Sequence, residues 1–408
     1  MIYTFYSYKG GVGRSMALAN IAERFHEKGL RVIIVDWDLE APGLETFFGS
    51  PTNDKHLSDM RARSGLIDML TAYKKAFPRF ASRHTGSTGA VAEMRGSGGA
   101  SSAQALKERY EHASSLTRKL LSEANFPEFL LDHGDSKAPQ VPSTLSAFLE
   151  DLYRTAPSSP VRSELPAPLA DSPFAQYLQS IHSPDQERNG IYLLSAGART
   201  DDRFGDYAST VQEFDWTEFY PAYEGREYFT WFRNQLQAIA DVILIDSRTG
   251  VTEMGGVCTR HIPDVVVSFC APNFQNVDGV VRVIAGLNKA KVKQARDERA
   301  IEVMVIPTRI DNSESDRLHE FSENFSKKVE QGGFVPAPLQ DFDRPLWDLQ
   351  IPYIPRYNYR EERVIGPGTA SPDPATQKLI DAYRRIAIHL ADIGPQPRPS
   401  TGSETLSA

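Results

Sequence analysis

Residues 8–15 read YKGGVGRS, and this stretch decides the fold. It follows the apolar run Ile2 to Ser7 and precedes an amphipathic segment, Ser15 to Lys28, that Gly29 closes. A glycine-rich turn between a strand and a helix lets several backbone N–H groups point at one anion, and the helix adds its positive end. The context predicts a phosphate loop; the alternative is a glycine-rich turn that binds nothing.

Side chains of this loop add chemistry that a plain turn lacks. The Ser15 hydroxyl can reach a magnesium ion, and the basic residue before it can reach the outer phosphates of a nucleotide. We therefore expect the following residues to bind the nucleotide: Gly10, Gly11, Val12, Gly13, Arg14, Ser15 and Met16.

Short apolar runs further along the chain predict the sheet. They are continuous rather than alternating, which is typical of parallel strands buried on both faces. Amphipathic stretches such as Asn276 to Arg296 separate them and predict crossover helices. The pattern indicates an α/β fold with a doubly wound, mostly parallel sheet. The predicted strands are Ile2 to Ser7, Arg31 to Asp36, Ile191 to Ser195, Val242 to Asp246, Val265 to Cys270 and Val303 to Pro307.

One region interrupts this alternation. Residues 51–189 contain no evident buried strand and predict a helical insertion, with helical periodicity at Gly65 to Phe80, Ala103 to Ala124 and Thr144 to Arg154. Residues 84–103 are rich in Gly, Ser and Ala and predict a flexible loop inside the insertion. The main domain would comprise residues 1–50 and 190–392, followed by a disordered tail at 393–408.

Composition excludes several classes of protein. The chain has 408 residues and a formal net charge of −8, which argues against a protein that coats DNA by charge alone. Its two cysteines, Cys258 and Cys270, form no CxxC pair and fit core residues of a protein in a reducing cytosol. No leader and no apolar window of about 18 to 20 residues is evident, so we expect a cytoplasmic protein without a membrane anchor.

Carboxylates follow two of the predicted strands. Asp36 and Asp38 lie two residues apart, so strand alternation places them on one face near the carboxyl edge, where ligands of α/β proteins bind. Alone, such a pair is equally typical of helix caps or solvated turns. Asp246 ends an apolar strand and would bond a water of the magnesium shell or the Ser15 hydroxyl. Ser15 and Asp246 are therefore candidate groups of a magnesium site, with Asp36 and Asp38 expected near the same edge of the sheet.

The run Lys9-Gly10-Gly11-Val12-Gly13-Arg14-Ser15 resembles the deviant Walker A loop of the ParA/MinD-type ATPases (the CobQ/CobB/MinD/ParA nucleotide-binding family). The resemblance implies a P-loop NTPase fold, ATP and Mg²⁺ as cofactors, and an ATP-dependent homodimer. It makes Lys9 the lysine that crosses to the partner's phosphates. Asp38 would orient or deprotonate the attacking water, and Asp36 would help to hold the magnesium shell. The metal site that the resemblance implies comprises Ser15, Asp36, Asp38 and Asp246.

This chain departs from the family at Arg14, where relatives carry a second lysine. Arginine keeps the charge but presents a planar fork, so the exchange is not conservative. We expect slow hydrolysis and intact ATP binding, with Lys9, Asp38 and Arg14 as the catalytic set. Arg248, two residues after Asp246, is either a phosphate sensor or the partner of a surface salt bridge.

Two later segments resemble the family's base-binding loops. Thr308, Arg309 and Asp311 follow the strand Val303 to Pro307, and Pro355 with Arg356 match an Ile-Pro-Arg segment that packs near the adenine. A T-x-x-D motif also occurs in GTPases, whose aspartate reads guanine, so the motif alone does not choose the base; we favour ATP over GTP. An ordinary strand-to-loop exit is the alternative for Pro355 and Arg356.

The resemblance implies a dimerising ATPase switch that controls a partner protein. The motifs around Arg14 and Asp246 resemble those of a bacterial branch of the family, whose members tend to act with signalling or defence proteins. One alternative is a nucleotide-sensing scaffold with little turnover, and another is a partition or positioning ATPase. No strong sign of nucleic-acid binding is present. The aromatic stretch from Phe214 to Tyr220 is typical of a core.

Overall fold

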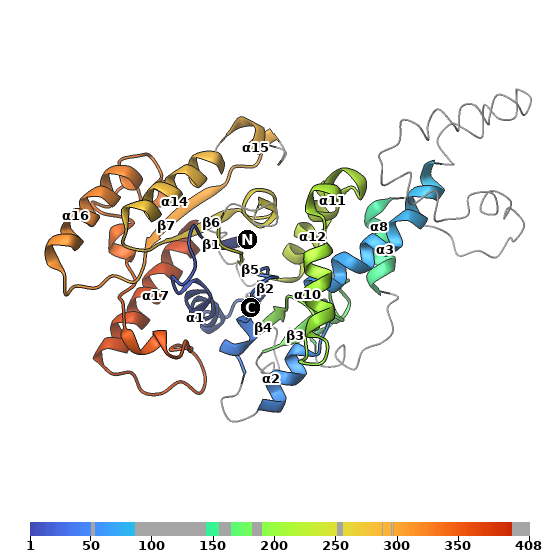
Figure 1. Ribbon diagram of the computed structural model, residues 1–408, viewed down its shortest axis with the longest axis horizontal. Helices are drawn as coiled ribbons and strands as arrows, with labels where there is room; N and C mark the ends of the chain where they lie inside the picture. The colour runs from blue at the N-terminus through green and yellow to red at the C-terminus, as the bar shows by residue number, and fades with distance from the viewer. Residues whose placement is uncertain are drawn as a thin grey trace, which may run out of the picture.

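The computed structural model describes residues 1–49, 54–85, 144–154, 165–181, 190–250, 256–287, 289–294, 296 and 298–393. Its strands form one sheet in the order β3-β4-β2-β5-β1-β6-β7 (Figure 1). All neighbouring strands are parallel except β3, which runs antiparallel to β4. The strands are β1 Ile2–Ser7, β2 Val32–Asp36, β3 Leu178–Ser180, β4 Ile191–Leu194, β5 Val242–Asp246, β6 Val265–Cys270 and β7 Glu302–Pro307.

The predicted fold class is confirmed. Each predicted strand is present, because each is an apolar run that the helical layers bury on both sides. The expectation that residues 51–189 hold no buried strand is wrong at one place. β3 has only three residues, too few for a periodic pattern, and is recognisable only through its pairing with β4.

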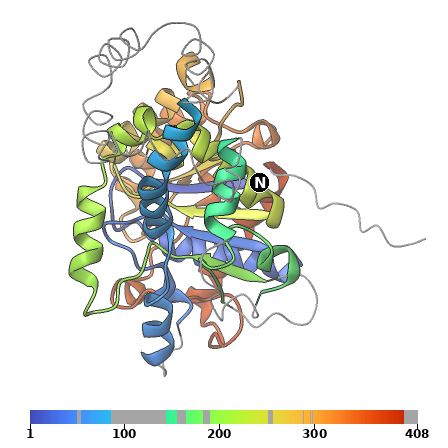
Figure 2. The same cartoon turned by 90° about the vertical axis from the view of Figure 1, so that its right-hand side faces the viewer.

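Helices cover both faces of the sheet. Figure 1 shows α1, α14, α16 and α17 on one side of it and α3, α8, α10 and α12 on the other, and Figure 2 shows α3, α8 and α10 again in the second view. Two apolar cores fill the layers between sheet and helices. The helices are α1 Arg14–Glu27, α2 Asp54–Arg61, α3 Leu66–Thr85, α8 Leu145–Arg154, α9 Ala167–Ala170, α10 Phe204–Glu213, α11 Trp216–Ala222, α12 Gly225–Ile239, α14 Phe274–Leu287, α15 Ala290–Gln294, α16 Ser315–Phe325 and α17 Pro374–Ile393.

Short helical turns join these elements. They are the 3-10 helices at Leu44–Phe47, Ala337–Leu339, Trp347–Leu349 and Pro355–Asn358, and the π-helical turns at Val257–His261 and Ser326–Glu330. The helix predicted over Asn276 to Arg296 is in fact two helices, α14 and α15. Gly286, a poor helix former, lies just before the break. The predicted end of α1 is present: Gly29 has φ of 77° and its N–H bonds the His26 carbonyl.

The described part of the predicted insertion is spread over the sheet and both of its faces. Helices α3 and α8 share a core with α11 and α12, Met60 of α2 belongs to the core on the α1 face, and β3 is a strand of the sheet. The boundaries of the insertion, residues 51–189, stay a prediction. The segment Ala103 to Ala124, the predicted loop beyond Thr85 and the tail beyond Ile393 lie outside the described residues. Within the described chain, no helix is both long and apolar enough to cross a membrane.

Candidate functional site

The glycine-rich loop adopts a backbone that requires glycine. Gly11 and Gly13 have φ of 70° and 78°, values that side chains with a Cβ rarely tolerate. Gly13 lies directly before the first turn of α1, whose free N–H groups face the loop. A Cβ built on either glycine would meet no atom within 4 Å, so the space above the loop is open. The loop has the shape of an anion cradle at a helix N-terminus.

A buried cluster of charged side chains lies beneath this loop. Asp246, at the end of β5, accepts from Arg14 Nε at 2.5 Å and from Ser15 Oγ at 2.5 Å. Arg14 Nη2 also pairs with Asp38 Oδ2 at 3.2 Å, and the Arg14 side chain is only 7% exposed. Burial opposes the charge on Arg14, but Asp246 and Asp38 outweigh it and raise the pKa of the guanidinium.

One atom of the cluster has no protein partner. Arg14 Nη1 is buried and makes no hydrogen bond to any described residue. An unsatisfied buried donor on a cation is costly, and an incoming oxygen anion would satisfy it. The cluster therefore fits a bound phosphate group beside the loop.

The two aspartates after β2 have different surroundings. Asp36 is paired in register with Asp246, is 1% exposed, and accepts the backbone N–H groups of Asp38 at 3.2 Å and of Gly43 and Leu44 at 3.3 Å. Burial raises the pKa of Asp36 to about 8, and Asp246 pushes the same way. Burial also raises the pKa of Asp38, although Arg14 opposes it. Asp36 thus holds the loop after β2, and Asp38 faces the cluster.

Two further cations of the site are paired in this structure. Lys9 Nζ donates to Gln275 Oε1 at the start of α14. Arg248 pairs with Glu40, joining the segment after β5 to the one after β2. Both pairs are partly exposed to solvent, unlike the cluster around Arg14.

A small pocket opens beside the phosphate loop. Thr308 Oγ1 donates to the Val12 carbonyl at 2.8 Å, and Arg309 Nη1 donates to the Gly11 carbonyl at 2.5 Å. Arg309 also donates to Asn358 Oδ1 at 2.7 Å, so the guanidinium bridges two walls of the pocket. The lining residues are Val12, Gly13, Met16, Thr308, Arg309, Ile351, Pro352, Tyr353, Ile354, Tyr357, Asn358, Glu361, Leu379 and Tyr383.

Three residues predicted for base binding are not among those that line this pocket. Asp311 is exposed and accepts the N–H of Ser313 at 2.9 Å. Pro355 is exposed, and Arg356 pairs with Asp373 at the start of α17 while donating to the Tyr357 hydroxyl at 2.8 Å. Four other lining residues, Tyr353, Ile354, Tyr357 and Asn358, lie within two residues of Pro355 and Arg356. Their closeness to that segment was the only sequence signal for them. The α17 residues Leu379 and Tyr383 carried no signal beyond helical amphipathicity.

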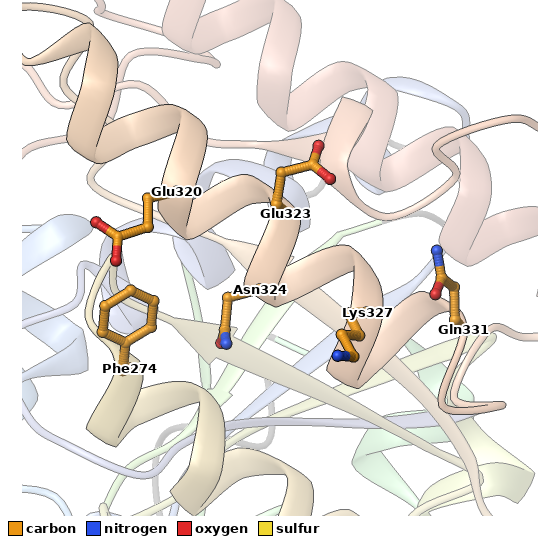
Figure 3. A pocket seen from close by; sticks show the side chains of 6 residues that line it. All are labelled: Phe274, Glu320, Glu323, Asn324, Lys327 and Gln331. Carbon is orange, nitrogen blue, oxygen red and sulfur yellow. The ribbon is translucent and has the colours of Figure 1, made fainter.

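A second groove lies apart from the phosphate loop. Figure 3 shows the Phe274 ring facing Glu320 and Asn324 across it, while the Glu323 side chain points away from Phe274. Its remaining lining residues, Lys327 and Gln331, follow α16. It contains none of the predicted site residues, so we place the candidate site at the loop. Among the described residues, no group of three or more His, Cys, Asp or Glu could hold a metal alone.

Comparison with known proteins gives one family match. The model of the CobQ/CobB/MinD/ParA nucleotide-binding domain matches residues 3–346. No curated protein sequence matches the chain.

Several solved structures are similar to this chain at low identity. The MinD cell division protein of Aquifex aeolicus is 14% identical, with 94% of this chain and 95% of that chain covered and a TM-score of 0.41. A ParA family ATPase from Chlorobium tepidum TLS is 13% identical, with 95% and 98% covered and a TM-score of 0.45. Cobyrinic acid a,c-diamide synthase from Mycobacterium smegmatis is 14% identical, with 98% and 99% covered and a TM-score of 0.45. Similarities this distant carry no argument about ligands.

Proposed function

The chain belongs to the CobQ/CobB/MinD/ParA nucleotide-binding family, and from that premise we propose that it is a Mg²⁺-dependent ATPase whose ATP-bound form dimerises and controls a partner protein. The observation that carries the proposal is the Arg14 cluster. It combines an open glycine cradle, a buried cation with one unpaired N–H, and two strand-end carboxylates. A triphosphate and a divalent cation complement these groups in charge.

Binding would use the loop backbone first. The N–H groups from Gly10 to Met16 and the guanidinium of Arg14 would hold the phosphates. The Ser15 hydroxyl and the carboxylates of Asp246 and Asp38 are the groups available to the magnesium shell, and Asp36 would join them only after releasing the three backbone N–H groups that it accepts. Magnesium favours one or two carboxylates together with phosphate oxygens and water, so such a small set of protein ligands suits it. The bound ion would neutralise charge that develops on the transferred phosphoryl group.

Hydrolysis requires the buried cluster to rearrange. Arg14 is held by Asp246 through Nε and by Asp38 through Nη2, so it offers a phosphate its unpaired Nη1 alone unless it leaves one of the two carboxylates. Asp38, at 17% side-chain exposure, is then the carboxylate free to orient a water molecule. Lys9 would exchange Gln275 for the phosphates of a second copy.

The surroundings of Asp311 favour ATP over GTP. An aspartate that reads guanine must point into the base pocket, whereas Asp311 is exposed and bonded within its own turn. The pocket is lined by aromatic and apolar side chains together with Thr308, Arg309, Asn358 and the carboxylate of Glu361. The preference for ATP therefore rests on the position of Asp311, and affinities for ATP and GTP measured by calorimetry test it.

A nucleotide-sensing scaffold with little turnover is the second candidate. The buried pair of Arg14 and Asp246 favours it, because separating the two at each cycle would leave a buried charge without its partner. The two candidates differ only in the rate of hydrolysis, so the rate with and without a partner protein decides between them.

Dimerisation is tested by light scattering of the full chain with ATP, ADP, GTP or a non-hydrolysable ATP analogue. We expect a dimer with ATP and with the analogue, but not with ADP or GTP. The dimer should be lost in Lys9→Ala. It should be retained in the control variant Lys28→Ala, since Lys28 is an exposed residue at the end of α1. A mass that stays the same under every condition would remove the dimer from the proposal.

The role of Asp38 has its own test. We expect Asp38→Ala to bind ATP in calorimetry, with a smaller gain in affinity from Mg²⁺, while losing any hydrolysis, because the carboxylate acts on water and the magnesium shell rather than on the phosphates. Asp206→Ala, an exposed carboxylate on α10, should keep both. Loss of ATP binding in Asp38→Ala alone would show that the role is assigned wrongly.

A further inference from the structure

The segment after β2, residues 36–39, is held from the face of the sheet opposite α1. Strand alternation directs Asp36 and Asp38 to one side and Trp37 and Leu39 to the other. Trp37 is fully buried in the core that α10 to α12 form with the sheet. The backbone N–H of Trp37 donates to the backbone carbonyl of Asp246 at 2.9 Å, which extends the pairing of β2 with β5 by one residue. The two carboxylates therefore share a backbone with an anchored indole.

Packing alone sets the position of this indole. Its centroid lies 5.7 Å from the ring of Phe229, 6.0 Å from that of Phe232 and 6.5 Å from that of Trp216. Its Nε1 is buried and finds no hydrogen-bond partner among the described residues. Close-packed interiors leave little freedom, so a shift of α11 or α12 must move Trp37 with it.

A single hydrogen bond ties the same segment to α10. The Tyr207 hydroxyl donates to the Leu39 carbonyl at 2.7 Å, and Tyr207 is the one buried residue of α10. The neighbouring Phe204 is 54% exposed, so the hydroxyl is the polar link between α10 and the segment. Trp37 and Tyr207 thus hold the backbone on both sides of Asp38, at residues 37 and 39.

The α1 side holds Asp38 less firmly. Its contact with Arg14 is 3.2 Å long, against 2.5 Å for the contact of Arg14 with Asp246. That contact would break if Arg14 exchanged Asp38 for a phosphate. Asp38 would then be held by the hydrogen bond from the backbone of Ala41 and by the backbone of residues 37 and 39. A displacement of about 1 Å can cost on the order of 100-fold in rate at a catalytic group.

We infer that Trp37 and Tyr207 are positioning residues for Asp38, through which the layer of α10 to α12 sets the rate of hydrolysis. The inference rests on the proposed ATPase function and deepens it. It gives a partner protein a route to the site: a partner that displaces α10 or α11 would move Asp38 without touching the nucleotide.

The decisive variant is Tyr207→Phe, which removes one hydroxyl oxygen and leaves the ring in place. Two matched controls remove a buried hydroxyl of the same kind. Tyr73→Phe loses a bond of 2.6 Å to the Tyr223 carbonyl in the same layer, and Tyr3→Phe loses one of 2.8 Å to the Leu390 carbonyl on the other face. We expect kcat of Tyr207→Phe to fall about 10-fold with KM within about 2-fold, and both controls to stay within about 2-fold of wild type.

A second measurement covers a protein that hydrolyses too slowly to assay. The affinity for a non-hydrolysable ATP analogue is measured by calorimetry with and without Mg²⁺. We expect Tyr207→Phe and Trp37→Phe to reduce the gain in affinity from Mg²⁺ several-fold, with unchanged affinity in its absence, because Asp38 belongs to the predicted magnesium shell. The controls should keep the full gain.

The possible outcomes distinguish a failure of the proposed ATPase function from a failure of the positioning role of Tyr207 and Trp37. A wild-type protein that binds no purine triphosphate with Mg²⁺ overturns the proposed function itself. A wild-type protein that binds, with Tyr207→Phe matching Tyr73→Phe in kcat and in the Mg²⁺ gain, overturns the positioning role alone. Equal losses in all three tyrosine variants would also overturn it, since they would report general loosening of the core.

Discussion

The two sides of residues 36–39 differ in chemistry. On the α1 side, Asp38 faces Arg14, Ser15 and Asp246 in a cluster of ion pairs and short hydrogen bonds. On the other side, Trp37 packs among aromatic rings. The groups that would touch the ligand come from motifs near the strand ends. The groups that hold them in place come from residues 207–232, and only tertiary structure brings those to the site.

Arg14→Met is the change with the largest expected effect on this contrast. It removes the cation and leaves Asp246 and Asp38 facing each other in a buried site without a counter-charge. Removing one partner of a buried pair typically costs about 3 to 5 kcal/mol. We expect a loss of that size in the free energy of unfolding, measured in urea without nucleotide or Mg²⁺.

Arg24→Met is the matched control on the same helix. Arg24 pairs with Glu27 at 2.5 Å, with side-chain exposures of 23% and 37%. An (i, i+3) pair at a helix surface contributes about 0.2 to 0.5 kcal/mol. Equal losses in the two variants would mean that the cluster is no more than a surface pair, and that the charged side has no special role in the ligand-free protein.

The strands and the glycine-rich loop on the charged side leave patterns in the sequence for a physical reason. Strands buried on both faces must be continuously apolar, and a loop that wraps an anion must use glycine where φ is positive, so both leave local patterns. The pocket beside the loop leaves a pattern only in part: Val12, Thr308 and Arg309 lie in motifs, whereas Leu379 and Tyr383 reach it from α17, far along the chain. Asp311, Pro355 and Arg356 were predicted from their resemblance to the family's base-binding segments. They do not line the pocket, since a shift of one residue in a turn decides whether a side chain points inward.

The aromatic side was predicted only as core. The stretch from Phe214 to Tyr220 does pack there, as expected, with Phe219 fully buried. Nothing local shows that these rings surround Trp37, because the contact joins residues about 180 positions apart in the sequence. The hydrogen bond from Tyr207 to Leu39 joins residues 168 positions apart and likewise leaves no sequence pattern. Long-range packing of this kind has no periodic signature.

The pKa of Asp36 tests whether this residue belongs to the charged side or to the buried, uncharged interior between the two sides. Burial raises the pKa of Asp36 to about 8 in the folded protein, well above the unfolded value of about 3.9. The folded state therefore binds more protons than the unfolded state between these values. The free energy of unfolding should fall as pH rises through this window, by up to about 1.4 kcal/mol per unit.

Asp36→Asn isolates this contribution. The amide keeps an acceptor for the backbone N–H groups of Gly43 and Leu44 but cannot ionise. We expect the variant to lose less stability than wild type between about pH 5 and pH 7.5 in urea unfolding, without Mg²⁺. Parallel curves for the two proteins would show that Asp36 is already ionised when folded, and that it belongs to the charged side with Asp38.

Arg248→Ala should have the smallest effect. Arg248 and Glu40 are 32% and 47% exposed, and exposed ion pairs contribute about 0 to 1 kcal/mol. We expect Arg248→Ala and Glu40→Ala to lose the same small amount of stability, with ATP affinity in calorimetry within about 2-fold of wild type. A drop of about 10-fold in affinity for Arg248→Ala alone corresponds to about 1.4 kcal/mol, the size of a charge-assisted hydrogen bond to phosphate. That result would extend the charged side outward from the buried cluster to the segment after β5, with Glu40 as the group that holds Arg248 when no phosphate is bound.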